Sequence, residues 1–229
     1  PCCIGLSPSD YSYPTSLGIT EKDRLHIIDV TRHLSSQLQL LENRIPSDVW
    51  LTHAHFGHVD GLGLFGRETM NANGVNLHAS SKMMRLIEQT PQWSIMLEQG
   101  VFTPIEITDN QPVTNTEFTM TPLLVPHRDE LSDMHAFVLR GENHSILYLP
   151  DHDTWEETLA MHDADNIRQW FKNLAIDIAL IDGTFWSSDE LQSRSQDKVP
   201  HPPIKQTLEM LGYKPVSYTH LTLPTMRTV

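Results

Sequence analysis

The residues with the clearest chemical signature in this chain are three histidines within a short stretch, His53, His55 and His58. They come directly after the apolar run Val49–Thr52, which predicts a short buried strand. At a strand end, residues two positions apart point to the same side, so His53 and His55 can face one ion together. His58 can approach that ion from the flank. Because buried imidazoles need polar partners and neutral imidazole is a common metal ligand, this spacing predicts a metal site.

Two later strand ends carry residues that could complete such a site. His127 follows a long apolar run, and we predict that it is a further metal ligand. Asp151 follows another apolar run and is a candidate metal ligand or bridge, because ligands of α/β proteins gather beyond the carboxyl ends of strands. His152 and Asp153 lie beside it, and the sequence alone does not rank them.

Two more residues are candidates for a role in catalysis beside Asp151. Asp182 ends a third apolar run and could orient a water molecule, as could Asp151, or it could cap the turn that follows. His201 stands between prolines just before a predicted helix and could contact an anionic group of a substrate. We predict that Asp151, Asp182 and His201 carry the catalytic roles.

The remaining histidines show no converging partners in the sequence. One lies within a predicted strand and the others have polar or helical surroundings: His26, His33, His78, His135, His144 and His162. We interpret them as surface residues or as residues that support the site from behind. The two cysteines, Cys2 and Cys3, are adjacent and offer no spaced set for a disulfide framework. We therefore expect free thiols and a reducing, cytoplasmic setting.

The elements that must position these residues are short strands interspersed with helices. Apolar runs rich in β-branched residues predict strands at 25–30, 49–52, 120–126, 146–150 and 176–181. Predicted helices lie at 33–43, 59–69, 80–99, 154–174 and 202–211. The fourth of these could be two helices, with Asp163 or Asp165 capping the second. This order predicts one domain of α/β layers rather than a bundle or an all-β sandwich.

Charge and composition narrow the range of functions. The 229 residues include 16 Lys and Arg against 29 Asp and Glu, which gives a formal charge of −13. Such an acidic surface repels phosphate backbones, which argues against general nucleic-acid binding. No apolar run approaches the ~18 residues of a membrane span. We expect a protein that acts on a small molecule, with an oligomeric state that the sequence does not fix.

The last residues of the chain, 216–229, differ from the rest. They resemble a translated sequencing-adapter tail of the kind found at the ends of unrelated metagenomic fragments. The segment contains no acidic residue, whereas all 29 precede it. We therefore interpret 1–215 as the natural domain and 216–229 as a non-native tail. The alternative is a genuine final strand.

Taken together, several segments of the chain resemble the metallo-β-lactamase superfamily, whose mark is His-x-His-x-Asp-His after a strand. Within it they look most like the coenzyme PQQ biosynthesis protein B family. The matching segments are 52–58 with Gly61-Leu62, 66–68, 125–133, 147–156, 182–186 and 200–202. The resemblance implies a four-layer αββα sandwich, with two mixed sheets face to face, helices outside and the metal at one edge.

The chain departs from the superfamily pattern in ways that bear on the metal. Gly57 stands where the pattern usually has Asp, a ligand of the second metal. The resemblance also implies a first strand before Pro1 and a C-terminal segment with one more ligand histidine, near the position of His220. We therefore expect one ion rather than two, held by His53, His55 and His127 with Asp151 beside them and His58 nearby.

Three functions fit this interpretation. The first is a metal-dependent hydrolase, in which zinc lowers the pKa of a water molecule and polarises the bond to be cleaved. The second is an iron-dependent oxygenase acting on a PQQ precursor, because histidines and a carboxylate with open positions also suit Fe²⁺. The third is a carrier that holds a small molecule without turnover.

Overall fold

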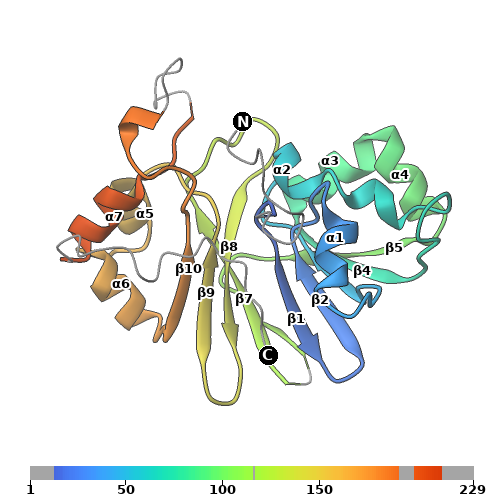
Figure 1. Ribbon diagram of the computed structural model, residues 1–229, viewed down its shortest axis with the longest axis horizontal. Coiled ribbons are helices and arrows are strands. Elements are labelled where there is room, and N and C mark those ends of the chain that lie inside the picture. Colours follow the sequence, from blue (N-terminus) through green and yellow to red (C-terminus); the bar gives the residue numbers. More distant parts are fainter. Residues whose placement is uncertain (1–12, 116, 191–198, 213–229) are drawn as a thin grey trace, which may run out of the picture.

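Two five-stranded sheets packed face to face form the centre of the protein (Figure 1). The computed structural model describes residues 13–115, 117–190 and 199–212. In the first sheet the strand order is β1 (Leu17–Glu21), β2 (Arg24–Ile28), β3 (Asp48–Trp50), β4 (Val75–Ser80) and β5 (Phe102–Ile107). In the second it is β10 (Ile178–Ile181), β9 (Ser145–Leu149), β8 (Met134–Arg140), β7 (Thr119–Val125) and β6 (Val113–Thr114). Both sheets are mixed. In the first, β1 pairs antiparallel with β2, whereas β2 pairs parallel with β3. In the second, β8 pairs antiparallel with β9, whereas β10 pairs parallel with β9.

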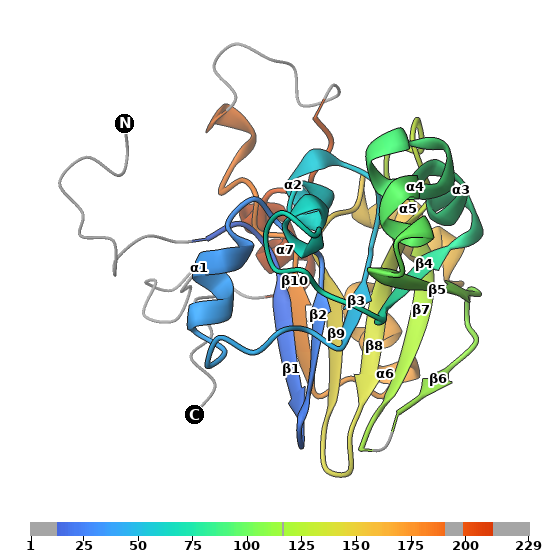
Figure 2. The same cartoon turned by 90° about the vertical axis from the view of Figure 1, so that its right-hand side faces the viewer.

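Helices cover the outer faces of the two sheets. On the first sheet lie α1 (Leu34–Gln39), α2 (Phe56–Val59), the 3-10 helix η2 (Leu62–Phe65), α3 (Ser81–Gln89) and α4 (Pro91–Glu98). On the second lie α5 (Trp155–Met161), α6 (Ile167–Asn173) and α7 (Ile204–Met210), with a 3-10 turn η3 (Ser188–Glu190) before α7. Figures 1 and 2 show α2 above the upper ends of the strands. The expected αββα sandwich is confirmed.

Three apolar clusters hold the four layers together. One joins the first sheet to its helices, a second joins the other sheet to α5 and α6, and the third lies between the sheets. Alternation along β8 shows how one strand serves two of them: Ala136 and Val138 face the helices, whereas Phe137 faces the other sheet. There Phe137 meets Trp50 edge to face, with ring centroids 5.9 Å apart. Since both partners are buried, this contact fixes the spacing of the sheets.

Most predicted elements are present, with boundaries and breaks that differ. The helix predicted at 59–69 is wrong, because α2 ends at Val59 and η2 follows only after Gly61, where any side chain would collide with the carbonyl oxygen of Thr31. The helix predicted at 80–99 is two, because Pro91 cannot continue α3 and instead begins α4. The stretch 154–174 is two helices, as one alternative had it.

The cap of the second helix in that stretch is neither Asp163 nor Asp165. Asn166 accepts a hydrogen bond from the Gln169 amide and begins α6. Five strands also lie where none was predicted: β1, β4, β5, β6 and β8. β4 alternates apolar and polar residues, a strand signal that the prediction did not use, and its Asn76 and His78 both bond to the buried Asp48.

Some predictions fall on parts of the chain outside the described residues. These concern Cys2 and Cys3, His220 and the tail 216–229, and they stay predictions. Within the described part of the chain, no helix has both the length and the apolar character needed to cross a membrane.

Candidate metal centre

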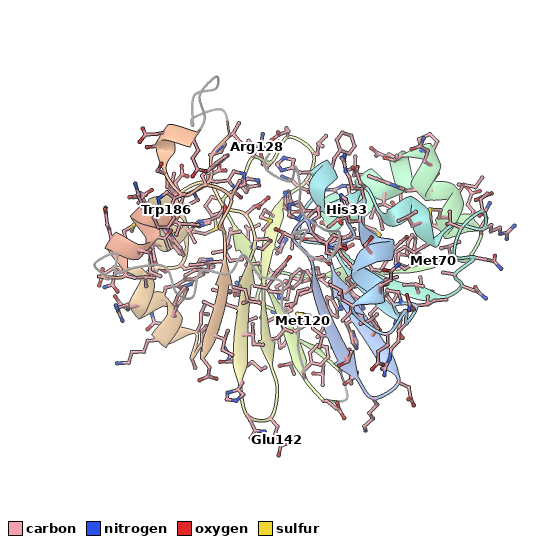
Figure 3. All side chains as sticks on the ribbon, in the orientation of Figure 1. His33, Met70, Met120, Arg128, Glu142 and Trp186 are labelled. Carbon is pink, nitrogen blue, oxygen red and sulfur yellow. The ribbon has the colours of Figure 1, made fainter. Side chains whose placement is uncertain are left out.

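The candidate site residues gather at one edge of the two sheets, on loops that follow strand ends. His53 and His55 follow β3, His127 follows β7, and Asp151 follows β9. Figure 3 shows Arg128 at this edge and Glu142, in the turn between β8 and β9, at the opposite end of the sheets. The fold thus brings together residues that are almost 100 positions apart in the sequence.

Four of these residues place ligand atoms around one point. Atoms of His53, His55, His127 and Asp151 all lie within 4.8 Å of one another, and we call these four residues the central cluster. His53 Nε2 is 2.9 Å from His55 Nδ1 and 3.4 Å from Asp151 Oδ2. His127 Nε2 is 3.7 Å from the same Asp151 oxygen. The structure therefore brings the three imidazoles together, as their positions after strands predict.

The far nitrogens of two of these rings are held in place by neighbouring side chains. His53 Nδ1 lies 3.0 Å from Thr52 Oγ1, and His127 Nδ1 lies 3.0 Å from Asp153 Oδ1. Partners of this kind orient imidazole ligands in metal proteins and set which nitrogen faces the ion. Here they turn Nε2 of both rings toward Asp151. Asp153, which the sequence could not rank, has this supporting position.

His58 lies on the flank of the central cluster. Its Nε2 is 3.1 Å from Asp151 Oδ2, and its Nδ1 donates to Asp29 Oδ2 at 2.7 Å. The backbone holds this geometry, because the Val30 amide donates to the His58 carbonyl and the Gly61 amide to the Val30 carbonyl. Gly57, by contrast, is exposed, and a Cβ there would have no atom within 4 Å.

Asp29 is a supporting residue that the sequence analysis missed. It is fully buried just after β2 and accepts hydrogen bonds from both the amide and the hydroxyl of Thr52, each at 2.9 Å. It therefore supports His53 through Thr52 and His58 directly. Its φ of 60° lies in the left-handed region, which Asp tolerates better than most residues. The available signal was its place at the end of an apolar run, the same signal that identified Asp151.

A second group shares Asp151 with the central cluster. Ligand atoms of Asp151, Asp182 and His201 also lie within 4.8 Å of one another. His201 Nδ1 donates to Asp182 Oδ2 at 2.7 Å, and Asp182 Oδ1 accepts from the Thr184 amide at 2.9 Å. Asp182 therefore both orients His201 and caps the following turn, so the two roles weighed from the sequence are compatible.

His152 is not part of either group, although it follows Asp151. It is fully buried, its Nδ1 lies 2.9 Å from Thr158 Oγ1, and its ring meets Trp155 at a centroid distance of 4.5 Å. Those contacts are with α5, so we interpret His152 as a residue that anchors the loop to that helix.

Electrostatics separates the imidazoles into two kinds. Burial has the largest effect on His53 and His127 and lowers their pKa values to about 3 and about 4. Burial also disfavours a charge on His58, but the carboxylates of Asp29 and Asp151 outweigh it and raise its pKa to about 10. Burial alone would raise the pKa of Asp151, yet hydrogen bonds from His53 and His58 hold it well below its usual range. At neutral pH an ionised Asp151 thus faces two uncharged imidazoles, His53 and His127, and a protonated His58 on the flank.

The structure corrects part of the prediction for the remaining histidines. His33 and His144 are exposed, as expected, and His162 is half-buried with its Nε2 3.0 Å from the Leu124 carbonyl oxygen. A surface position is wrong for three others, which are buried in the sheets: His26, His78 and His135. Both His26 and His78 face carboxylates between the sheets, and neither belongs to the candidate site.

The donor set fits a divalent transition metal. Histidine nitrogens with one carboxylate oxygen are the ligands that zinc and similar ions take in proteins. His127 Nε2 is buried and has no hydrogen-bond partner among the described residues, although its ring is aimed at Asp151. A buried nitrogen of this kind costs free energy unless something binds it. A metal ion at the central cluster would satisfy it.

Comparisons with known proteins agree with this fold. The model of the beta-lactamase superfamily domain matches residues 30–222, so the chain belongs to that superfamily. No curated protein sequence matches the chain.

Solved structures share the fold at low sequence identity. The zinc-bound PqqB of Methylobacterium extorquens is 15% identical, with a TM-score of 0.66 over 83% of this chain and 69% of that one. A diphosphatase of the PhnP family is 16% identical, with a TM-score of 0.63 over 93% and 73%. The short form of human tRNase Z is 13% identical, with a TM-score of 0.55 over 88% and 84%.

Proposed function

We propose that this chain is a metal-dependent hydrolase that binds one zinc ion at the central cluster. The observation that carries the proposal is the convergence of imidazole nitrogens on one buried carboxylate, with His127 Nε2 otherwise unsatisfied. His53, His55 and His127 would hold the ion together with Asp151, and His58 would support it from the flank. When bound, such an ion lowers the pKa of its water and polarises the bond to be cleaved.

The protein's own residues would divide the remaining tasks. Asp151, held ionised by His53 and His58, can accept a proton or a hydrogen bond and so orient a water molecule. His201 stands beside Asp151, and Asp182 fixes its ring. Burial lowers the pKa of His201, but Asp182 outweighs this effect and raises it, so the imidazole can carry a proton toward an anionic substrate group.

The similarity to a zinc-bound protein and to two hydrolases supports zinc and hydrolysis over other chemistries of this fold. The segments that resemble the PQQ biosynthesis protein B family support a place in that branch of the superfamily. At 13–16% identity the fold is what these proteins share, so the substrate has to be argued from this site. We propose a small molecule with an anionic group as the substrate.

A second candidate is an iron-dependent oxygenase acting on a PQQ precursor. The observation that favours it is a donor set of several imidazoles with a single carboxylate, which also suits Fe²⁺ with open positions. Metal identity separates the two candidates. Zinc favours hydrolysis and iron favours oxygenation.

The test is elemental analysis of protein purified without chelator, followed by assays on a panel of esters and phosphodiesters. We expect about one zinc per chain and metal-dependent turnover of at least one class. His127→Ala should lose both, whereas His144→Ala, an exposed histidine in the β8–β9 turn, should lose neither. Iron in place of zinc would overturn the hydrolase proposal, and bound zinc without any turnover would favour a carrier.

A further inference from the structure

Arg128 is a positively charged residue placed directly beside the central cluster. Its Nη2 is 3.4 Å from His55 Nδ1, and its side chain is about one-third exposed, at 35%. Figure 3 shows Arg128 at the edge of the sheets where the candidate site lies. A cation next to the ligands of a divalent cation is unfavourable unless a negative group separates them. Its position therefore calls for a function.

The backbone of Arg128 is fixed to the site. The Arg128 amide donates to Asp153 Oδ1 at 3.3 Å, and this same oxygen lies 3.0 Å from His127 Nδ1. One carboxylate thus orients an imidazole of the central cluster and sets where the Arg128 side chain begins. The Asp153 amide in turn donates to the Pro126 carbonyl. These bonds hold the backbone of Arg128 beside the site.

The contact between Arg128 and His55 competes with metal binding. His55 Nδ1 faces His53 Nε2 at 2.9 Å, which makes Nδ1 the atom that this ring offers to the central cluster. A neutral imidazole has one lone pair, which can accept from the guanidinium or bind a metal ion, and not both. A bound ion would therefore release Nη2 as a donor at the edge of the site.

No other group of the described residues fully satisfies the guanidinium. Arg128 Nε is buried and has no hydrogen-bond partner among those residues. The carboxylate of Glu130 approaches Nη1 only to 3.9 Å, beyond hydrogen-bond distance, and its side chain is 53% exposed. Glu130 therefore remains largely solvated and does not occupy the donors of Arg128.

Space for a substrate lies on the side of the site where His201 stands. A cavity of about 520 Å³ is lined by Asp153, His201 and Lys205, among others. The lining residue Asp153 also accepts the Arg128 amide, so this cavity borders the site through His201 and Asp153.

We propose that Arg128 binds an oxyanion of the substrate, a phosphate or a carboxylate, placed between the guanidinium and the metal ion. This inference rests on the proposed function and adds a substrate class to it. Guanidinium groups suit this role because they bind such anions through two parallel N–H donors. The anion would also separate the two positive charges.

The experiment measures anion affinity rather than turnover. Zinc-loaded wild-type protein and Arg128→Gln are titrated calorimetrically with inorganic phosphate and, separately, with acetate, after their zinc content has been determined. We expect Arg128→Gln to keep its zinc and to bind one of the anions about tenfold more weakly or worse, since a hydrogen bond to a charged group is worth ~1.5–3 kcal/mol. The anion that loses affinity identifies the substrate group.

Two further variants make the result specific. Arg32→Gln removes a charge from the surface pair with Asp60 and should leave both affinities unchanged. Arg128→Lys keeps the charge, so it should fold if the glutamine variant does not, and it should bind the anion several-fold more weakly than wild type does. Equal affinity in wild type and Arg128→Gln, or loss of zinc from Arg128→Gln, would overturn the inference while leaving the hydrolase proposal standing. If wild-type protein bound no zinc, the proposed function itself would be wrong.

Discussion

The protein contains two buried clusters of histidines and carboxylates, one beyond the end of β3 and one at its start. The central cluster lies beyond the carboxyl end of β3. The other, which we call the Asp48 network, lies at the start of β3 and faces the second sheet; it consists of Glu21, Arg24, His26, Asp48, Asn76 and His78. Both clusters have the residue types of a metal site. Only one has the geometry.

The two clusters differ in the groups that bond to their central carboxylates, Asp48 and Asp151. Both oxygens of Asp48 are bonded, one by Arg24 at 2.5 Å and the other by Asn76 at 2.9 Å and His78 at 3.0 Å. In the central cluster, Asp151 Oδ2 lies 3.4 Å from His53 Nε2 and 3.7 Å from His127 Nε2, and both of these imidazoles are uncharged at neutral pH. The Asp48 network thus satisfies its carboxylate with its own hydrogen-bond donors, whereas the uncharged imidazoles of the central cluster can still bind an ion.

An unpaired nitrogen is therefore not enough to identify a metal site. His26 Nδ1 and His78 Nδ1 are buried without hydrogen-bond partners among the described residues, as is His127 Nε2. What distinguishes His127 is that its unpaired nitrogen belongs to a group of four ligand atoms within 4.8 Å. Convergence separates a site that can bind an ion from a network that stabilises the fold.

The largest effect is expected from Asp151→Ala. This change removes the carboxylate that three imidazoles face, and its effect should exceed the ~10–100-fold loss of metal affinity typical when a supporting residue is changed. We expect no stoichiometric zinc in the purified variant by elemental analysis. Circular dichroism should show a folded protein, because the apolar clusters are untouched. Normal zinc content would show that the ion, if present, binds elsewhere.

A smaller loss is expected from Asp29→Asn, which changes the support of the site. Asn tolerates the left-handed backbone of this position as Asp does, so the change removes charge without adding strain. Because Asp29 supports His53 through Thr52 and His58 directly, we expect zinc affinity to fall ~10–100-fold. Competition with a chromogenic chelator measures it. An unchanged affinity would limit Asp29 to a role in folding.

Asp29 also shows what the sequence could and could not predict. The three histidines could be picked out as candidate metal ligands because they are close in sequence, and because two of them point to the same side at one strand end. His127 and Asp151 were identified through the same strand-end signal. The pairing of Asp29 with His58 was not, because it depends on β2 and β3 lying side by side, which local spacing does not encode.

The layered architecture and the possible break within 154–174 could be predicted, whereas the break after α2 could not. The αββα arrangement came from the resemblance of several segments, and it is confirmed. The interruption after α2 depends on the close approach of Gly61 to Thr31, a contact between separate segments. β8 was also not predicted, although it is buried on both faces and its residues are mostly apolar, as such a strand requires.

Asp48→Asn tests the contrast between the two clusters. This change should lower the stability of the fold and leave zinc binding unchanged. The amide would face Arg24 and leave buried donors without their acceptor, at a cost of about 1–3 kcal/mol. Denaturant unfolding of metal-free protein would measure this loss. Zinc content should equal that of wild type. A variant that lost zinc while keeping its stability would reverse the assignment of the two clusters.

The loss of stability at low pH should distinguish wild-type protein from Asp48→Asn. Burial alone would raise the pKa of Asp48, but hydrogen bonds from three neighbouring side chains outweigh it and hold that pKa well below its usual value. The unfolded chain then binds the proton more readily, so the stabilisation is present above the usual pKa of ~3.9 and is lost as the pH falls below it. Metal-free wild type should lose stability over that range more steeply than Asp48→Asn does.

The smallest effect is expected from Gly57→Asp, which tests whether a missing carboxylate limits the site to one ion. Gly57 is exposed between His55 and His58, and a Cβ there would meet no atom within 4 Å, so the side chain can be accommodated. An added oxygen ligand near His58 and Asp151 should allow a second, weakly held zinc, visible as a rise in stoichiometry at saturating metal. Gly63→Asp is the matched control, since Gly63 is also exposed and free of contacts but lies in η2, outside the site. A rise in both variants would reflect surface charge alone. If neither variant binds more zinc, a missing carboxylate does not limit occupancy. His58 would then remain committed to its two carboxylates, as the Asp48 network is to its own partners.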